Sequence, residues 1–102
     1  MLTNKQQKFI RSQAQKIKAT AQIGKNELSE SAIESIGKLL EANELVKVHL
    51  LAAAVITKKE AIAILTDTFY LEYAYSIGNQ LVIYKQSRNQ EKRIFSKSVE
   101  SK

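Results

Sequence analysis

Seven short segments with alternating helical and strand periodicity constrain the fold of this chain more than any other feature of its sequence. Apolar residues recur as in amphipathic helices at residues 4–16, 30–42 and 58–69. They alternate or cluster as in strands at residues 18–23, 44–50, 71–77 and 81–84. Two helical crossovers and one hairpin then connect four strands. The order α-β-α-β-α-β-β predicts an α+β two-layer sandwich, with the helices covering one face of a mixed four-stranded sheet.

Local signals mark the ends of these elements. A Thr followed three residues later by Gln or Glu forms a capping box, and the two candidates are Thr3 with Gln6 and Thr57 with Glu60. The pair Gly78-Asn79 suits a two-residue hairpin turn. Beyond residue 86 the chain is polar and charged. We therefore predict one domain in residues 1–86, followed by a mobile basic tail in residues 87–102.

Positive charge is concentrated at the two ends of the chain. The 102 residues carry sixteen Lys or Arg and ten Asp or Glu, a net charge of +6. Residues 1–25 hold six cations and no acid, and residues 85–102 hold six cations and two acids. Charge on one side of a domain is typical of phosphate binding, but basic ends also keep a small domain soluble. Charge alone leaves both interpretations open.

Composition argues against several classes of function. With no cysteine, one histidine (His49) and one aspartate (Asp67), the chain lacks a recognisable catalytic or metal-ligating cluster. We therefore expect no catalysis, no metal and no other cofactor. The Gly24-Lys25 pair also lacks the long glycine-rich loop and the Lys-Ser/Thr ending of a nucleotide-binding P-loop. Since neither a signal peptide nor a membrane span is indicated, we expect a cytoplasmic protein with no membrane partner. We also expect a monomer with no small-molecule substrate.

The loop that begins at Gly24 carries the sharpest functional signal. An apolar segment runs into Gly24-Lys25 and then into a helix that Ser29 can cap. A helix N-terminus leaves backbone N–H groups unpaired and carries partial positive charge, so it binds anions. Gly24 either lets a phosphate approach the backbone or supplies a positive φ for the turn, and Lys25 adds a cation. We predict that this loop contacts a nucleic-acid backbone.

The first helix carries a second group of candidate phosphate ligands. They lie largely away from its apolar face, and no acid lies among them; they are Lys5, Lys8, Arg11 and Lys18. Ordinary exposed helices mix charges of both signs, so the pattern favours a side that faces RNA over one that is merely solvated.

The strands and the tail add further candidates with competing interpretations. Lys47 and His49 lie on the less apolar face of their strand, which is either open to RNA or covered by a helix. Lys85 can add a phosphate contact at the start of the tail. Tyr73 and Tyr75 alternate as base-stacking platforms do, but the same spacing is that of core residues, which we favour.

Four motifs, in order and at characteristic spacing, resemble one protein family. They are Leu2-Thr3-x-Lys5-Gln6, Ile23-Gly24-Lys25-Asn26, Glu44-Leu45-Val46-Lys47-Val48 and Ile77-Gly78-Asn79-Gln80-Leu81-Val82-Ile83-Tyr84-Lys85. This pattern resembles the YhbY-type RNA-binding proteins, which are bacterial single-domain members of the CRM group (chloroplast RNA splicing and ribosome maturation). The similarity covers about residues 2–85.

The resemblance implies both a fold and a function. The fold would be similar to the C-terminal domain of bacterial initiation factor three. The protein would bind ribosomal RNA in precursors of the large ribosomal subunit as an assembly factor. The family's Gly-x-x-Gly loop, which resembles the RNA clamp of KH domains, corresponds to residues 24–27 and adds Asn26 to the expected RNA contacts. Glu27 replaces the second glycine, so its carboxylate either points away from the phosphate or weakens the contact.

One segment departs from the family pattern and suggests an alternative function. Residues 51–56 are apolar where the relatives are usually polar. An exposed apolar segment is typical of a protein contact, so the alternative is a protein–protein interaction module that uses residues 51–56.

Overall fold

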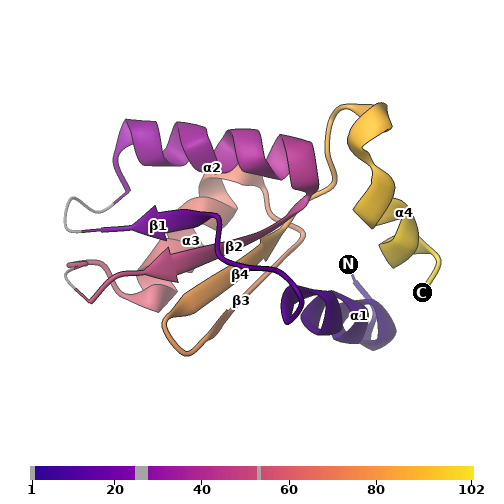
Figure 1. Cartoon of the computed structure of the whole chain (residues 1–102), viewed down its shortest axis with the longest axis horizontal. Coiled ribbons are helices and arrows are strands. Elements are labelled where there is room, and N and C mark those ends of the chain that lie inside the picture. Colours follow the sequence, from indigo (N-terminus) through magenta and orange to yellow (C-terminus); the bar gives the residue numbers. More distant parts are fainter. Residues whose placement is uncertain (1, 25–27, 53) are drawn as a thin grey trace.

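The fold is built on one mixed four-stranded sheet (Figure 1). It is described here from a computed structural model that covers residues 2–24, 28–52 and 54–102. The strand order is β1-β2-β4-β3, in which β1 is parallel to β2 and the other pairs are antiparallel. Along the chain the elements are α1 (Asn4–Ala14), β1 (Ala21–Ile23), α2 (Glu30–Asn43), β2 (Leu45–Leu50), α3 (Lys58–Phe69), β3 (Tyr73–Ile77), β4 (Gln80–Tyr84), a short 3-10 helix (Gln90–Lys92) and α4 (Ile94–Glu100). The α+β class, the mixed sheet and the predicted order of the first seven elements are confirmed.

The predicted local signals form as expected. The Thr3 and Thr57 side chains each accept the N–H of the residue three positions later, and the side chains of those residues accept the cap N–H in return. Both capping boxes therefore fix helix starts, at α1 and α3. Gly78 has a φ of 57° in the β3–β4 turn, and no atom lies within 4 Å of the position of an added Cβ. The turn thus needs glycine for its backbone conformation alone.

The first face of the sheet packs against α2 and α3. Its buried cluster comes from alternating strand residues and from one stripe of each helix, and it comprises Ile23, Ile36, Leu40, Val46, Val48, Ile56, Ala61, Leu65, Leu81 and Ile83. In α2, a Cβ added at Gly37 would lie 3.0 Å from the Phe69 ring. Glycine at this position therefore lets α2 approach α3 closely.

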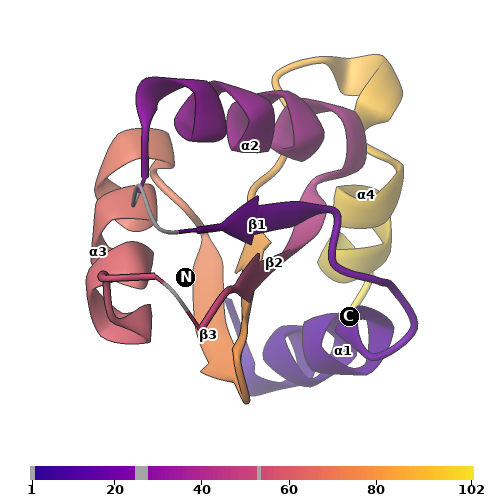
Figure 2. The ribbon, with the colours of Figure 1, turned by 60° about the vertical axis from the view of Figure 1, so that its left-hand side comes forward.

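The second face of the sheet is partly covered by α1 and α4 (Figure 2). Its smaller cluster consists of Ile10, Ala14, Leu45, Val82, Tyr84 and Val99. The prediction that helices cover one face is therefore right for α2 and α3 and wrong for α1. The reason lies in β4, where Val82 and Tyr84 are as deeply buried as Leu81 and Ile83. Apolar side chains on both faces of one strand require a cover on each side.

The C-terminal segment differs from its prediction. The sequence predicts a mobile tail over residues 87–102, whereas the structure shows a 3-10 helix followed by α4, which packs against α1. Phe95 stacks on Phe9 with ring centroids 5.7 Å apart, and Val99 is 1% exposed. Phe9 lies more than 80 residues from Phe95 in the chain, so the local composition of the segment gave no sign of this contact.

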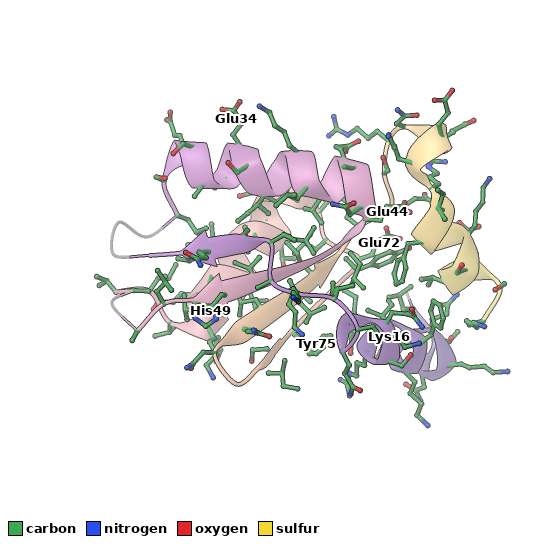
Figure 3. The ribbon with its side chains drawn as sticks, in the orientation of Figure 1. Lys16, Glu34, Glu44, His49, Glu72 and Tyr75 are labelled. Carbon is green, nitrogen blue, oxygen red and sulfur yellow. The ribbon has the colours of Figure 1, made fainter. Side chains whose placement is uncertain are left out.

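A buried carboxylate ties this segment to the sheet. Glu44 follows α2 with a φ of 66° and is 0% exposed, and it lies where the C-terminal segment approaches β2 (Figure 3). One of its oxygens accepts the Ser87 N–H at 2.7 Å, and the other accepts the Ser96 N–H at 2.9 Å. Ser96 lies in the first turn of α4, where N–H groups otherwise lack partners. Glu44 therefore fixes the start of α4.

Candidate nucleic-acid interface

The exposed side of α1 carries cations without opposing charge. Apolar residues of α1 turn towards the sheet and α4, and the outer side presents Lys5, Lys8 and, just past the helix, Lys16, with Arg11 at its edge where it reaches β3; all four are exposed. Among the described residues, the ion pairs are Lys38–Glu34 and Arg88–Glu41, and neither involves α1. The exposure predicted for Lys5, Lys8 and Arg11 is thus confirmed, and their charges remain available to a polyanion.

Arg11 differs from the other cations because its position is fixed. Its Nε donates a hydrogen bond to the Tyr73 hydroxyl at 2.8 Å. Its guanidinium carbon also lies 5.2 Å from the centroid of the Tyr75 ring and 5.9 Å from that of Tyr73. Both contacts are within the range of a cation–π interaction. The predicted core position of these tyrosines holds in part, since both pack against the second cluster but remain partly exposed.

Lys47 has a structural partner that the sequence did not reveal. Its side chain is half-buried, and its ammonium donates to the carbonyl of Ala14 at 3.1 Å and to that of Ile17 at 3.4 Å. These carbonyls lie at the C-terminal end of α1, where a cation stabilises the helix. The sequence left this strand face either open to RNA or covered by a helix. At Lys47 the structure shows that α1 covers it.

Gly24 directly follows β1 and does not need to be glycine for its conformation. Its φ lies outside the positive range, and an added Cβ would make an ordinary 3.5 Å contact with a Leu51 methyl group. Of the two interpretations of Gly24, positive φ at the turn is therefore wrong, and close approach of a ligand to the backbone remains a prediction. The predicted contacts Lys25 and Asn26, and the departure at Glu27, lie outside the described residues.

Of the two remaining predicted cations, Lys18 adjoins this group and Lys85 lies apart from it. Lys18 is exposed in the connection between α1 and β1. Lys85 follows β4 on the α2 side of the sheet and lines a cavity of about 570 Å³ whose other cations are Lys38, Arg88 and Lys92. Figure 1 shows α1 and the C-terminal end of β1 towards opposite ends of the long axis of the molecule. The predicted site residues that the structure describes therefore do not form one cluster.

The structure does bring Arg11 and Lys47 together. Both line a cavity of about 300 Å³ between α1 and the sheet, and Tyr75 lines it too. Figure 3 shows Tyr75 on the α1 side of the sheet, between α1 and the β3–β4 hairpin. Sequence reasoning named each of these residues but did not join them, because the contact depends on the angle at which α1 crosses the strands.

The C-terminal segment adds cations beside α1 that sequence reasoning did not single out. Lys97 is exposed on α4, and the Lys102 ammonium lies 4.9 Å from the centroid of the Phe9 ring. The spacing of Phe95 and Val99, one helical turn apart, was the available signal for a helix that places these lysines beside α1.

Other kinds of site find no support in the part of the chain that the structure describes. Within residues 2–24, 28–52 and 54–102, no group of three His, Cys, Asp or Glu side chains lies close enough to hold a metal ion. No helix in these ranges has the length and apolar character needed to cross a bilayer. In the alternative contact segment, Ile56 is buried in the core and Ala54 packs against it, which leaves Val55 as the well-exposed large apolar side chain. One such side chain does not make a docking surface.

These features define a small α+β domain in which a basic helix lies against a mixed sheet. Residues 2–85 match the model of the CRS1/YhbY (CRM) domain family. The chain is 35% identical over 88 residues to Probable RNA-binding protein YqeI of Bacillus subtilis (strain 168), covering 86% of this chain and 92% of that protein. The solution structure of the hypothetical protein SAV1595 from Staphylococcus aureus, described as a candidate RNA-binding protein, matches with a TM-score of 0.72 and 39% identity over 88% of this chain and 94% of that one. The chain therefore belongs to the CRS1/YhbY (CRM) family.

Proposed function

We propose that this protein binds RNA without catalysis and acts on ribosomal RNA in precursors of the large ribosomal subunit, as an assembly factor. The observation that carries the proposal is the uncompensated charge of α1. Four exposed cations lie on one side of the helix and its end, and the described residues offer them no ion pair. Family membership and the RNA-binding descriptions of two relatives support the same class of ligand. The ribosomal target rests on the family resemblance.

The charge arrangement suits a phosphate backbone better than a single anion. The cations are spread along one helix, so they match a row of phosphates, and a capping box together with Lys47 holds both ends of that helix. Binding of this kind releases counterions. The logarithm of the affinity then falls with the logarithm of salt concentration, by about 0.7 per phosphate contact for single strands and about 0.9 for duplexes.

Two single substitutions with the same change in charge test the role of α1. Lys8→Gln removes a cation from the α1 side, and Lys38→Gln removes an exposed cation from α2. Fluorescence anisotropy with a labelled fragment of large-subunit ribosomal RNA gives the affinity at several salt concentrations. We expect Lys8→Gln to weaken binding and lower the salt slope by about one contact. Equal effects of both substitutions, or an affinity independent of salt, would contradict the role of α1.

The ribosomal target needs a test in cells. A lysate containing the tagged protein is fractionated on a sucrose gradient at low salt, with and without RNase. We expect the protein to migrate with precursors of the large subunit and to leave them after RNase treatment. Protein found only at the top of the gradient would argue against stable binding to these particles.

A further inference from the structure

The second face of the sheet is left uncovered towards the β3–β4 hairpin. The strand register places side chains on this face in three rows across β2, β4 and β3, which are Leu45–Tyr84–Tyr73, Lys47–Val82–Tyr75 and His49–Gln80–Ile77. The first row lies under α1 and α4, and its Leu45 and Tyr84 are buried. The third row is open, with Ile77 55% exposed. The cavity of about 300 Å³ lies over the middle row, where the cover ends.

The walls of this cavity combine an aromatic ring, two cations and one amide able to read a hydrogen-bonding pattern. Tyr75 and Val82 belong to the sheet side, and α1 contributes Arg11 and, just past its end, Gln15. The Gln15 amide can both donate and accept a hydrogen bond, whereas the register places the Ser76 side chain on the opposite face of the sheet, beside Leu81. No carboxylate is among the described residues that line it. The cavity therefore suits a flat, polar-edged group attached to an anion.

Arg11 is held in place before any ligand arrives. The hydrogen bond from Nε to the Tyr73 hydroxyl fixes the guanidinium beside the Tyr75 ring, and the two tyrosine rings lie 5.4 Å apart at 41°. The Tyr75 hydroxyl is a donor at neutral pH, as tyrosine ordinarily is; burial raises its pKa, with a further contribution from Tyr73 that outweighs the lowering by Arg11. An ordered guanidinium beside an aromatic ring is the arrangement on which unpaired bases stack.

We propose that this cavity binds one unpaired base of the RNA, stacked on Tyr75 and beside the Arg11 guanidinium, with its edge towards Gln15. The inference rests on the proposed RNA-binding function and adds to it that the target carries a bulge, loop or single strand at this point. A volume of about 300 Å³ is at the lower end of ligand pockets and is large enough for one base. The exposed Lys8, one turn from Arg11, lies where the adjacent backbone would pass.

The test compares two identical substitutions on two RNA forms. Tyr75→Leu removes the ring from the cavity, and Tyr70→Leu removes a ring that is 79% exposed at the end of α3. The probes are a labelled single-stranded octamer of mixed sequence and the blunt duplex of the same sequence. Loss of one stacked base weakens binding by about 5- to 150-fold. We expect this loss for Tyr75→Leu on the octamer, with less than a twofold change on the duplex and for Tyr70→Leu on either probe.

The outcomes separate this inference from the proposed function. If the wild-type protein binds the octamer and the duplex but Tyr75→Leu binds both as well as Tyr70→Leu does, the base site is refuted and RNA binding stands. If the wild-type protein binds neither probe, RNA binding itself fails, and the base site with it. A second measurement needs no variant. Uridine monophosphate should shift the amide resonances of Ser76 and Val82 in the wild-type protein, and ribose 5-phosphate should not. Equal shifts with both ligands would mean that only the phosphate binds, and would refute the base site.

Discussion

Removal of the Glu44 carboxylate should release the C-terminal segment without unfolding the sheet. The two hydrogen bonds to Ser87 and Ser96 are made by a side chain with no exposed surface. Hydrogen bonds to a charged group contribute about 1.5–3 kcal/mol each, so Glu44→Ala removes about 3–6 kcal/mol of interaction. α4 is only seven residues long and is marginal by itself. The segment can therefore detach while the rest of the domain stays folded. The free energy lost in Glu44→Ala then cannot exceed the free energy that docks the segment.

Native-state hydrogen exchange distinguishes undocking from global unfolding. The reporter is the Lys97 amide, which is bonded within α4 to the Arg93 carbonyl and not to Glu44, and the reference is the Val46 amide in β2. With 3 kcal/mol lost, exchange at Lys97 should accelerate about 150-fold in Glu44→Ala, while exchange at Val46 changes much less. Glu44→Gln should lie between, because its amide keeps one acceptor oxygen.

A surface carboxylate provides the control for this experiment. Glu34→Ala removes an exposed i,i+4 ion pair with Lys38 and should change the free energy of unfolding by less than about 0.5 kcal/mol. The reasoning would be refuted if Lys97 in Glu44→Ala exchanged at the wild-type rate. Equal acceleration at Lys97 and Val46 would refute it differently, since the segment and the sheet would then unfold as one unit.

Three further predictions follow from the described contacts. Gly24→Ala should weaken RNA binding while leaving the free energy of unfolding within about 0.5 kcal/mol of wild type in urea titrations. Gly78→Ala replaces a residue at positive φ and should lower the free energy of unfolding by about 1–2 kcal/mol. Lys47→Met should destabilise the protein by about 1–3 kcal/mol in the same titrations, because the Ala14 and Ile17 carbonyls lose their hydrogen bonds to the Lys47 ammonium. Burial, with nearby carboxylates, raises the pKa of Tyr84 well above its usual value, so the unfolded state loses this proton near pH 10 while the folded state keeps it. Stability should therefore fall as pH rises above about 10, and Tyr84→Phe should make urea midpoints fall less steeply there.

The sheet and its first helical layer could be predicted because their signals are local. Val46 and Val48 alternate with Lys47 along one strand, and the capping residues lie three positions from their partners. The second layer could not be predicted in the same way. Burial of Val99 depends on α1, and the start of α4 depends on Glu44, which is 52 residues from Ser96. A polar composition therefore concealed a helix in which Phe95 and Val99 pack against other elements while Ile94 stays exposed.

The candidate site shows the same limit at the level of single cations. Lys8, Arg11 and Lys47 looked alike in sequence, as positive charges on the polar side of a periodic element. Helical periodicity sufficed to place Lys8 in solvent, because exposure on an outer helix face needs no partner. The positions of Arg11 and Lys47 depend instead on hydrogen-bond partners that are distant in sequence. Arg11 bonds to a tyrosine hydroxyl 62 residues away, and Lys47 bonds to two carbonyls at least 30 residues away. Lys8 is consequently free to follow a moving phosphate backbone, whereas Arg11 is fixed and can define one position on the RNA. Lys47 holds the end of the helix that carries both.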